Sequence, residues 1–213
     1  MPRNKEVAAC SPMPLQADAF NRQAQLPYGL TTDHVCRAMQ DFLDFLGFVN
    51  GQLNTKQIER LESFLMPAGF SSMVGEFIAT ALPKYCHALV RNKRHNGHPD
   101  ILPKGQFPGD SALHATQGIE VKGSRHKSGW QGHNPEEVWL MVCVFDSNTS
   151  RDAALEIEPR PFQFIKIVGA QLTREDWSYS GRSETSRRTI TASVTRSGAA
   201  KLEANWIYRA SSG

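Results

Sequence analysis

The feature that most constrains the fold is an uninterrupted apolar run, VWLMVCVF, at residues 138–145. A strand with one face in water alternates apolar and polar residues, and this run has no polar position. We therefore expect a strand that is covered on both faces, as strands in the middle of a sheet are. With 213 residues, 40% of them hydrophobic, the chain is large enough to bury one sizeable core around such a strand.

Helical spacing of apolar residues predicts three helices before this strand. The first should begin near Asp33, the second span residues 55–66, and the third run over about residues 72–91. Pro67 is expected to end the second helix, and Pro83 to kink or split the third. The inward face of the first helix should carry five apolar side chains, Val35, Met39, Phe42, Leu43 and Leu46.

The later part of the chain has the turn residues and short apolar runs of strands. Two strands are expected at residues 98–102 and 117–123, joined by a connection rich in Pro and Gly. A further strand is expected at residues 162–168, a fifth at 189–195, and a last helix at about 197–208. Helices followed by a hairpin, a buried strand and mixed elements predict an α/β fold, with a mixed central β-sheet flanked by helices.

The sequence also limits where the protein works. No apolar run approaches the roughly 18 residues needed to cross a bilayer, so we expect no membrane partner. Residues 1–14 lack the apolar stretch of a secretion signal, and the four cysteines have neither metal-site nor disulfide spacing. We therefore expect a cytoplasmic protein with free thiols.

Charge is unevenly distributed, although the net charge is only +3. Residues 84–127 carry eight basic and three acidic side chains, and residues 174–213 carry seven and four. The two other parts of the chain are acidic overall. A site that attracts a polyanion would need such basic zones, while chance clustering on a solvated surface would explain them equally well.

The residues that carry chemistry are Pro99-Asp100 and, after nineteen intervening residues, Glu120-Val121-Lys122. Because side chains alternate along a strand, Glu120 and Lys122 should share one face while Val121 points into the core. Asp100, at the end of the preceding strand, can face them across the strand pair. Two carboxylates supply hard oxygen ligands for a divalent metal, and a lysine can orient or help deprotonate a water and offset negative charge. The pattern is therefore typical of phosphodiester hydrolysis.

These residues resemble the signature of the PD-(D/E)XK nuclease superfamily, found in type II restriction endonucleases and in repair and recombination nucleases. The resemblance covers about residues 72–146. It implies a restriction-endonuclease-like core in which Asp100 and Glu120 bind Mg²⁺ and Lys122 assists the attacking water. In that superfamily an acidic residue on the preceding helix often joins the metal site, which implies a catalytic and metal-binding role for Glu76.

The resemblance further implies an endonuclease that cuts double-stranded DNA, and a type II restriction enzyme recognising a short sequence is the preferred interpretation. Cutting both strands requires two active sites, so we expect a homodimer. Residues 1–70, a partly ordered arm followed by helices, are the candidate dimerisation region. Residues 71–213 would then form the nuclease core with a C-terminal DNA-contacting elaboration.

Several alternatives stay open. Asp110, ten residues before Glu120, could be the first acid in place of Asp100, although it lies in a Pro-Gly turn where Asp commonly bonds the local backbone. A repair, resolvase or mobile-element nuclease would use the same chemistry and select structure instead of sequence. A DNA-binding module without catalysis could share the fold. A surface hairpin with a solvated Glu–Lys pair would explain the pattern without any function.

Two segments hold residues suited to contact DNA. The polar loop after Lys122 offers basic groups for phosphates or guanine, amides for adenine, and a tryptophan that can stack or wedge. Its candidates are Arg125, Lys127, Trp130, Gln131, His133 and Asn134. The second basic zone adds, among many hydroxyls, Arg182, Arg187 and Arg188. The alternative is that Trp130 packs down as a lid and the other side chains of its loop are solvated.

Overall fold

The apolar run forms strand β5 (Trp139–Asp146), which lies inside a six-stranded sheet. The structure is a computed structural model that describes residues 2–132, 135–180 and 191–211. Every residue of β5 except the last is buried. β5 lies between a parallel neighbour, β3 (Ile119–Ser124), and an antiparallel one, β6 (Gln163–Gln171). The expected central position of this strand is therefore confirmed.

The large sheet is mixed, with the strand order β1-β2-β3-β5-β6-β9. Its remaining strands are β1 (Leu89–Arg91), β2 (Ile101–Pro103) and β9 (Trp206–Arg209). All neighbours run antiparallel except β3 and β5, so the fold is α/β with a mixed sheet, as the sequence predicts. A second, antiparallel sheet has the order β4-β8-β7 and consists of β4 (Gln131–Gly132), β7 (Trp177–Ser180) and β8 (Thr191–Val194).

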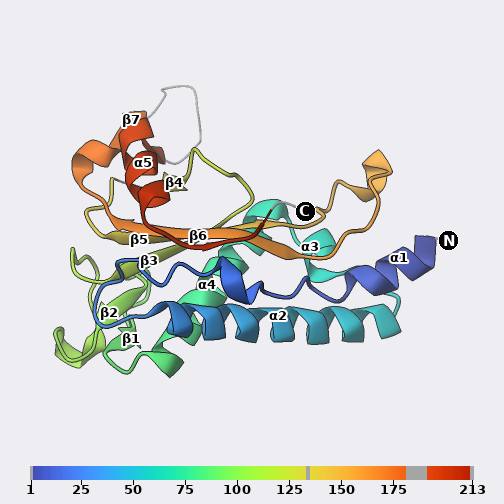
Figure 1. Cartoon of the computed structure of the whole chain (residues 1–213), viewed down its shortest axis with the longest axis horizontal. Coiled ribbons are helices and arrows are strands. Elements are labelled where there is room, and N and C mark those ends of the chain that lie inside the picture. The colour runs from blue at the N-terminus through green and yellow to red at the C-terminus, as the bar shows by residue number, and fades with distance from the viewer. Residues whose placement is uncertain (1, 133–134, 181–190, 212–213) are drawn as a thin grey trace.

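The large sheet is covered on both faces (Figure 1). α2 (Thr32–Thr55) and α4 (Pro67–Tyr85) pack on one face, and α5 (Arg196–Ala204) and the small sheet lie on the other. Alternate residues of β5 enter different cores: Met141 joins the α2–α4 core, and Leu140 joins the core beneath α5. Burying one large apolar side chain contributes about 1.5–3 kcal/mol to stability, so an apolar residue is favoured at every position of a strand that lies between two cores.

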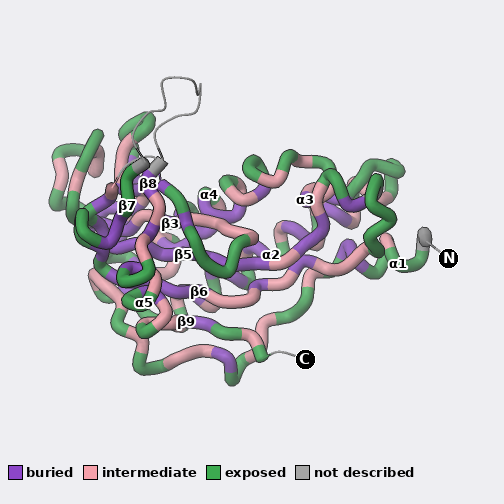
Figure 2. The backbone as a smooth tube through the Cα atoms, turned by 90° about the horizontal axis from the view of Figure 1, so that it is seen from above, coloured by how far each residue is buried: buried purple, intermediate pink, exposed green. Residues whose placement is uncertain are grey.

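Short helical segments complete the chain. They are α1 (Pro2–Ala9), α3 (Leu61–Phe64) and the 3₁₀ turns η1 (Ala17–Ala19), η2 (Pro108–Asp110), η3 (Ala153–Leu155) and η4 (Arg174–Asp176). Figure 2 shows buried positions along the large sheet and on α2 and α4, with exposed positions mainly in the connections around them. Among the helices of the described ranges, none is both long enough and apolar enough to span a membrane.

Helix α2 forms as its sequence predicts. Thr31 is the N-cap, and its hydroxyl accepts a hydrogen bond from the His34 N–H at 3.3 Å. The His34 ring accepts one from the Thr31 N–H at 3.2 Å, so two backbone donors at the helix start are satisfied. All five apolar side chains expected on the inward face are buried.

The expected helix over residues 55–66 is wrong. Apart from Thr55, where α2 ends, only α3, four residues long, is helical there, and Ile58 is exposed. Pro67 begins α4 instead of ending a helix, because a proline at the first helical position loses no hydrogen bond. α4 runs past Pro83 to Tyr85, and the last residues of the expected third helix form the strand β1 instead.

The two terminal regions also differ from expectation. The last helix ends at Ala204, and β9 follows it as an edge strand along β6. The strand expected at residues 189–195 is β8, which belongs to the small sheet; residues 189–190 lie outside the described ranges. Residues 2–31 contain α1 and η1, and Phe20 and Asn21 of this arm lie beside β9. The division near residue 70 stays a prediction, although α2 and α4 share one apolar core.

Candidate active site

Two adjacent strands bring the three motif residues together. Asp100 immediately precedes β2, and Glu120 and Lys122 lie on β3. Val121 packs into the α2–α4 core, so Glu120 and Lys122 point to the opposite face of the sheet, as strand alternation predicts. The Asp100 N–H donates to Glu120 Oε2 at 3.3 Å, and the Val121 N–H donates to Asp100 Oδ2 at 3.0 Å. These bonds hold Asp100 and Glu120 side by side.

Lys122 lies between two carboxylates. Its Nζ is 2.9 Å from Glu120 Oε1 and 3.5 Å from Glu136 Oε1. Burial opposes a charge on this amine, but Glu120 and Glu136 outweigh it and raise the pKa of Lys122. Lys122 is therefore an ammonium at neutral pH and offsets part of the negative charge of the acids.

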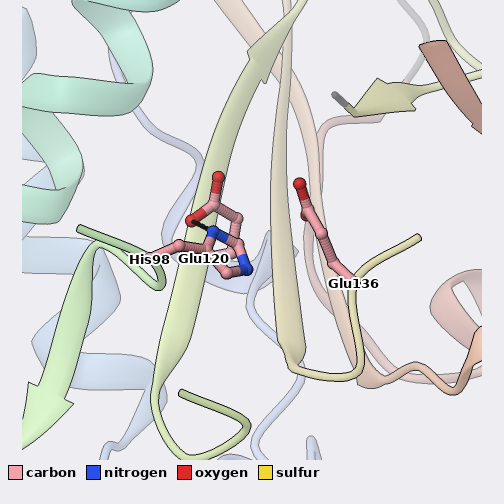
Figure 3. A group of neighbouring side chains, drawn as sticks. All are labelled: His98, Glu120 and Glu136. Carbon is pink, nitrogen blue, oxygen red and sulfur yellow. Dashed lines mark ion pairs between the residues drawn. The ribbon is translucent and has the colours of Figure 1, made fainter. Parts of the chain in front are cut away.

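The structure adds His98 and Glu136 to the site (Figure 3). His98 Nδ1 is 3.0 Å from Glu120 Oε2. His98, Glu120 and Glu136 each offer one atom that can bind a metal, and these atoms all lie within 4.8 Å of one another. His98 comes from the segment before β2, and Glu136 from the segment before β5. Neither residue was predicted from the sequence.

A signal for Glu136 exists, but it depends on how the strands pair. β3 and β5 run parallel, with Ile119 opposite Trp139, so both strands begin at the same end of the sheet. Glu136 and Glu120 flank these two starting points and come together there. His98 adjoins the Pro99-Asp100 half of the motif, so proximity in sequence alone could have indicated it.

The three acids of the site differ in their affinity for protons. Burial and the charge of Glu120 raise the pKa of Asp100 to about 7. Burial alone would raise the pKa of Glu120 too, but His98 and Lys122 lower it to about 2. Burial raises the pKa of Glu136 in spite of Lys122. Three carboxylates, of which Glu136 is buried and Asp100 and Glu120 are partly buried, therefore share one ammonium and one imidazole. An added cation would favour their charged forms.

A cleft of about 1260 Å³ opens onto the three acids and His98, whereas Lys122 is not one of its lining residues. The three acids and His98 line it together with Arg174, Trp177 and Tyr179, which come from η4 and β7. Pockets for small molecules measure roughly 300–1,000 Å³, so this cleft has room for part of a polymer.

No family model, curated protein or solved structure matches the chain. What the site can do therefore follows from its own chemistry. It has carboxylates that can hold a divalent cation, an ammonium beside them, and a cleft with room for a polymer. The carboxylates and the ammonium are the groups that metal-assisted hydrolysis of a phosphodiester uses.

The group of potential metal ligands, His98, Glu120 and Glu136, includes neither Asp100 nor the other two candidate acids, Glu76 and Asp110. Glu76 lies on α4, is exposed and forms an ion pair with Arg91. Its charge still contributes to the raised pKa of Asp100, after burial and Glu120, so it stands at the margin of the site. Asp110 accepts hydrogen bonds from the Gly105 N–H at 2.9 Å and from Lys93 Nζ at 3.2 Å. Asp100, and not Asp110, is therefore the acid beside Glu120.

The candidate DNA-contacting residues fall into three groups. Arg125 and Trp130 are turned inward: Arg125 donates to Ser147 Oγ and the Asn148 carbonyl, and Trp130 is buried. The Trp130 ring therefore cannot stack on a base in this arrangement, which agrees with the alternative of a lid. Lys127 and Gln131 are exposed and can contact a ligand. The remaining candidates lie outside the described residues: His133, Asn134, Arg182, Arg187 and Arg188.

Proposed function

We propose that the protein is a Mg²⁺-dependent endonuclease that hydrolyses phosphodiester bonds in double-stranded DNA. The observation that carries this proposal is that Asp100, Glu120 and Lys122 lie together and that the two acids line one cleft. Backbone hydrogen bonds join the two acids, and the ammonium lies 2.9 Å from Glu120. The element order also supports it, because the resemblance to PD-(D/E)XK nucleases implies a helix, a hairpin and a buried strand. α4, β1 to β3 and β5 follow in that order.

The residues of the site fit a hard divalent cation. Mg²⁺ prefers oxygen ligands, which Asp100 and Glu120 supply from neighbouring strands. Glu136 Oε2 is buried and finds no hydrogen-bond partner within the described part of the chain. Burial and the nearby charge of Glu120 raise the pKa of Asp100, and a bound cation would favour its carboxylate form. Asp100 and Glu120 would hold the ion, and when bound it would supply positive charge against the scissile phosphate.

The protein's own side chains account for the other requirements. Lys122, kept protonated by Glu120 and Glu136, offsets the charge that develops on the phosphate and can donate a hydrogen bond that orients a water. Arg174 lies at the cleft, where a positive charge attracts a polyanion. Glu76 would contribute to the metal site if it released Arg91.

The preferred biological role is that of a type II restriction enzyme acting in the cytoplasm. We include a homodimer in the proposal, because cutting both strands of a duplex needs two sites. Discrete fragments from a long natural DNA would indicate a short recognition sequence. Cutting confined to branched or mismatched DNA would indicate a repair, resolvase or mobile-element enzyme instead.

The test is cleavage of long natural DNA by the purified protein with Mg²⁺, beside Lys122→Ala and Glu120→Gln. Each variant should cut at least about 100-fold more slowly, the size of effect seen when one charge-stabilising group is removed from an active site. Lys104→Ala changes an exposed lysine after β2 and should cut at the parental rate. A Lys122 or Glu120 variant with parental activity would refute the proposal. Binding of DNA with Ca²⁺ but no cleavage of any DNA with Mg²⁺ would identify a binding module.

A further inference from the structure

Beside the proposed nuclease residues lies a histidine that the proposed chemistry does not use. His98 Nδ1 contacts Glu120, while its Nε2 is buried and has no partner among the residues described. Glu136 is only 8% exposed, and its Oε2 is likewise without a partner there. Buried polar atoms normally have partners, because losing contact with water is costly. A nitrogen and an oxygen left in this way at one site point to a ligand that both can bind.

We propose that His98, Glu120 and Glu136 form a mixed nitrogen–oxygen site for a divalent transition metal, with Mn²⁺ bound more tightly than Mg²⁺. One atom from each residue lies within 4.8 Å of the other two, which a single ion can bridge with small side-chain movements. The site shares Glu120 with the proposed nuclease centre, so the inference rests on the proposed function and adds a preference for a transition metal to the Mg²⁺ dependence proposed there.

The donor set decides which metals are favoured. Mg²⁺ takes oxygen ligands in near-ideal octahedral geometry and keeps several waters, so an imidazole offers it little. First-row transition metals accept imidazole nitrogen, and Mn²⁺ also accepts the carboxylates that Mg²⁺ uses. A set of one imidazole and two carboxylates therefore favours Mn²⁺ over Mg²⁺, and His98 is the residue that creates the preference.

Lys122 does not supply the missing partner. Its Nζ lies near Oε1 of Glu120 and Oε1 of Glu136, and the partnerless oxygen of Glu136 is Oε2. An ammonium can only donate hydrogen bonds, so it cannot be the hydrogen-bond partner of a ring nitrogen that already carries a proton. A metal ion would accept electron pairs from the carboxylates and from a deprotonated ring nitrogen together.

The test measures metal binding without DNA. The metal-free protein is titrated calorimetrically with Mn²⁺ and, separately, with Mg²⁺, and the Mn²⁺ complex is examined by pulsed electron paramagnetic resonance for coupling to a ¹⁴N ligand. We expect a Kd for Mn²⁺ at least about tenfold below that for Mg²⁺, and a nitrogen coupling in the parent protein. His98→Asn should weaken Mn²⁺ binding about tenfold or more and remove the coupling, with little change for Mg²⁺. Glu136→Gln should weaken the binding of both ions.

His114→Asn is the matched control, because His114 is exposed and lines the same cleft but lies outside the cluster. It should leave both affinities and the nitrogen coupling unchanged. Bound Mn²⁺ without nitrogen coupling in the parent, or no Mn²⁺ binding, would overturn the inference even if a variant failed to fold. If the protein then still cleaved DNA, the nuclease proposal would be unaffected. If Mn²⁺ bound with nitrogen coupling but no DNA was cleaved, only the nuclease proposal would be refuted.

Discussion

The close approach of α4 to β3 gives a sharp prediction. β3 carries Glu120 and Lys122, and at Gly123 its backbone lies against α4. A Cβ added to Gly123 would stand 2.2 Å from the Ser71 carbonyl oxygen and 3.1 Å from the Gly75 nitrogen. Ordinary contacts of a Cβ begin at 3.4 Å, so Gly123→Ala requires α4 and β3 to separate by about 1 Å.

The size of the effect follows from that contact. The clashing atom belongs to the helix backbone, so no side-chain rotation relieves it. Overpacking usually costs about 1–3 kcal/mol, and a clash with backbone belongs at the upper end, about 3 kcal/mol for Gly123→Ala. Because 1 kcal/mol shifts the Tm of a chain of this size by about 2–4 °C, the variant should melt about 6–12 °C below the parent.

Urea unfolding followed by circular dichroism measures the free energy of unfolding directly. Gly51→Ala is the matched control: Gly51 lies within α2, and none of the described residues would stand within 4 Å of its Cβ. Since alanine favours a helix, this control should gain about 0.5–1 kcal/mol. A Gly123→Ala protein as stable as the parent would show that α4 and β3 do not lie as close as described.

Two other predictions concern buried charges away from the cleft. Arg60 is only 2% exposed and lies 2.6 Å from the fully buried Glu62, so Arg60→Ala should lower the free energy of unfolding in urea by about 3–5 kcal/mol, because that acid is left unpaired. Arg151→Ala, at an exposed arginine, should change the free energy of unfolding by less than about 0.5 kcal/mol. A loss that small for Arg60→Ala would contradict the pairing. Burial opposes ionisation of Asp176, but Lys201 at 2.7 Å and the hydrogen bonds from Thr173 together outweigh it and lower the pKa. The charged carboxylate therefore stabilises the fold above about pH 4, and this stabilisation is lost as the pH falls through the native pKa. The stability gap between the parent and Asp176→Asn should therefore be largest near neutral pH and shrink towards about pH 3; a gap independent of pH would refute the role of the charge.

The features that the sequence predicted well are those that residues close together in the chain determine. The apolar run of β5 and the helical spacing of α2 were enough to place both elements, because each pattern records which faces are buried. The alternation of Glu120, Val121 and Lys122 predicted correctly which side chain enters the core. Each of these patterns depends only on residues that are close together in the sequence.

What the sequence did not predict depends on distant partners. Glu136 lies near Glu120 only because β5 pairs in parallel with β3, and the sequence of neither strand determines that pairing. β9 follows a helix too closely to show a strand pattern and forms because the edge of β6 is free to pair. The exposed Ile58 has helical spacing with Leu61 and Leu65, but no core lies beneath it.

The N-terminal arm has a consequence for how copies of the protein could assemble. β9 is the last strand at its edge of the large sheet, and such an edge invites pairing with another chain. The Asn21 N–H donates to the Ile207 carbonyl at 2.9 Å, the Asn21 side chain to the Trp206 carbonyl at 2.9 Å, and Phe20 bridges to Tyr208. The arm thus occupies backbone groups on the outer edge of β9 that a strand of a second copy would have to pair with. A dimer formed by extending the sheet past β9 is therefore obstructed.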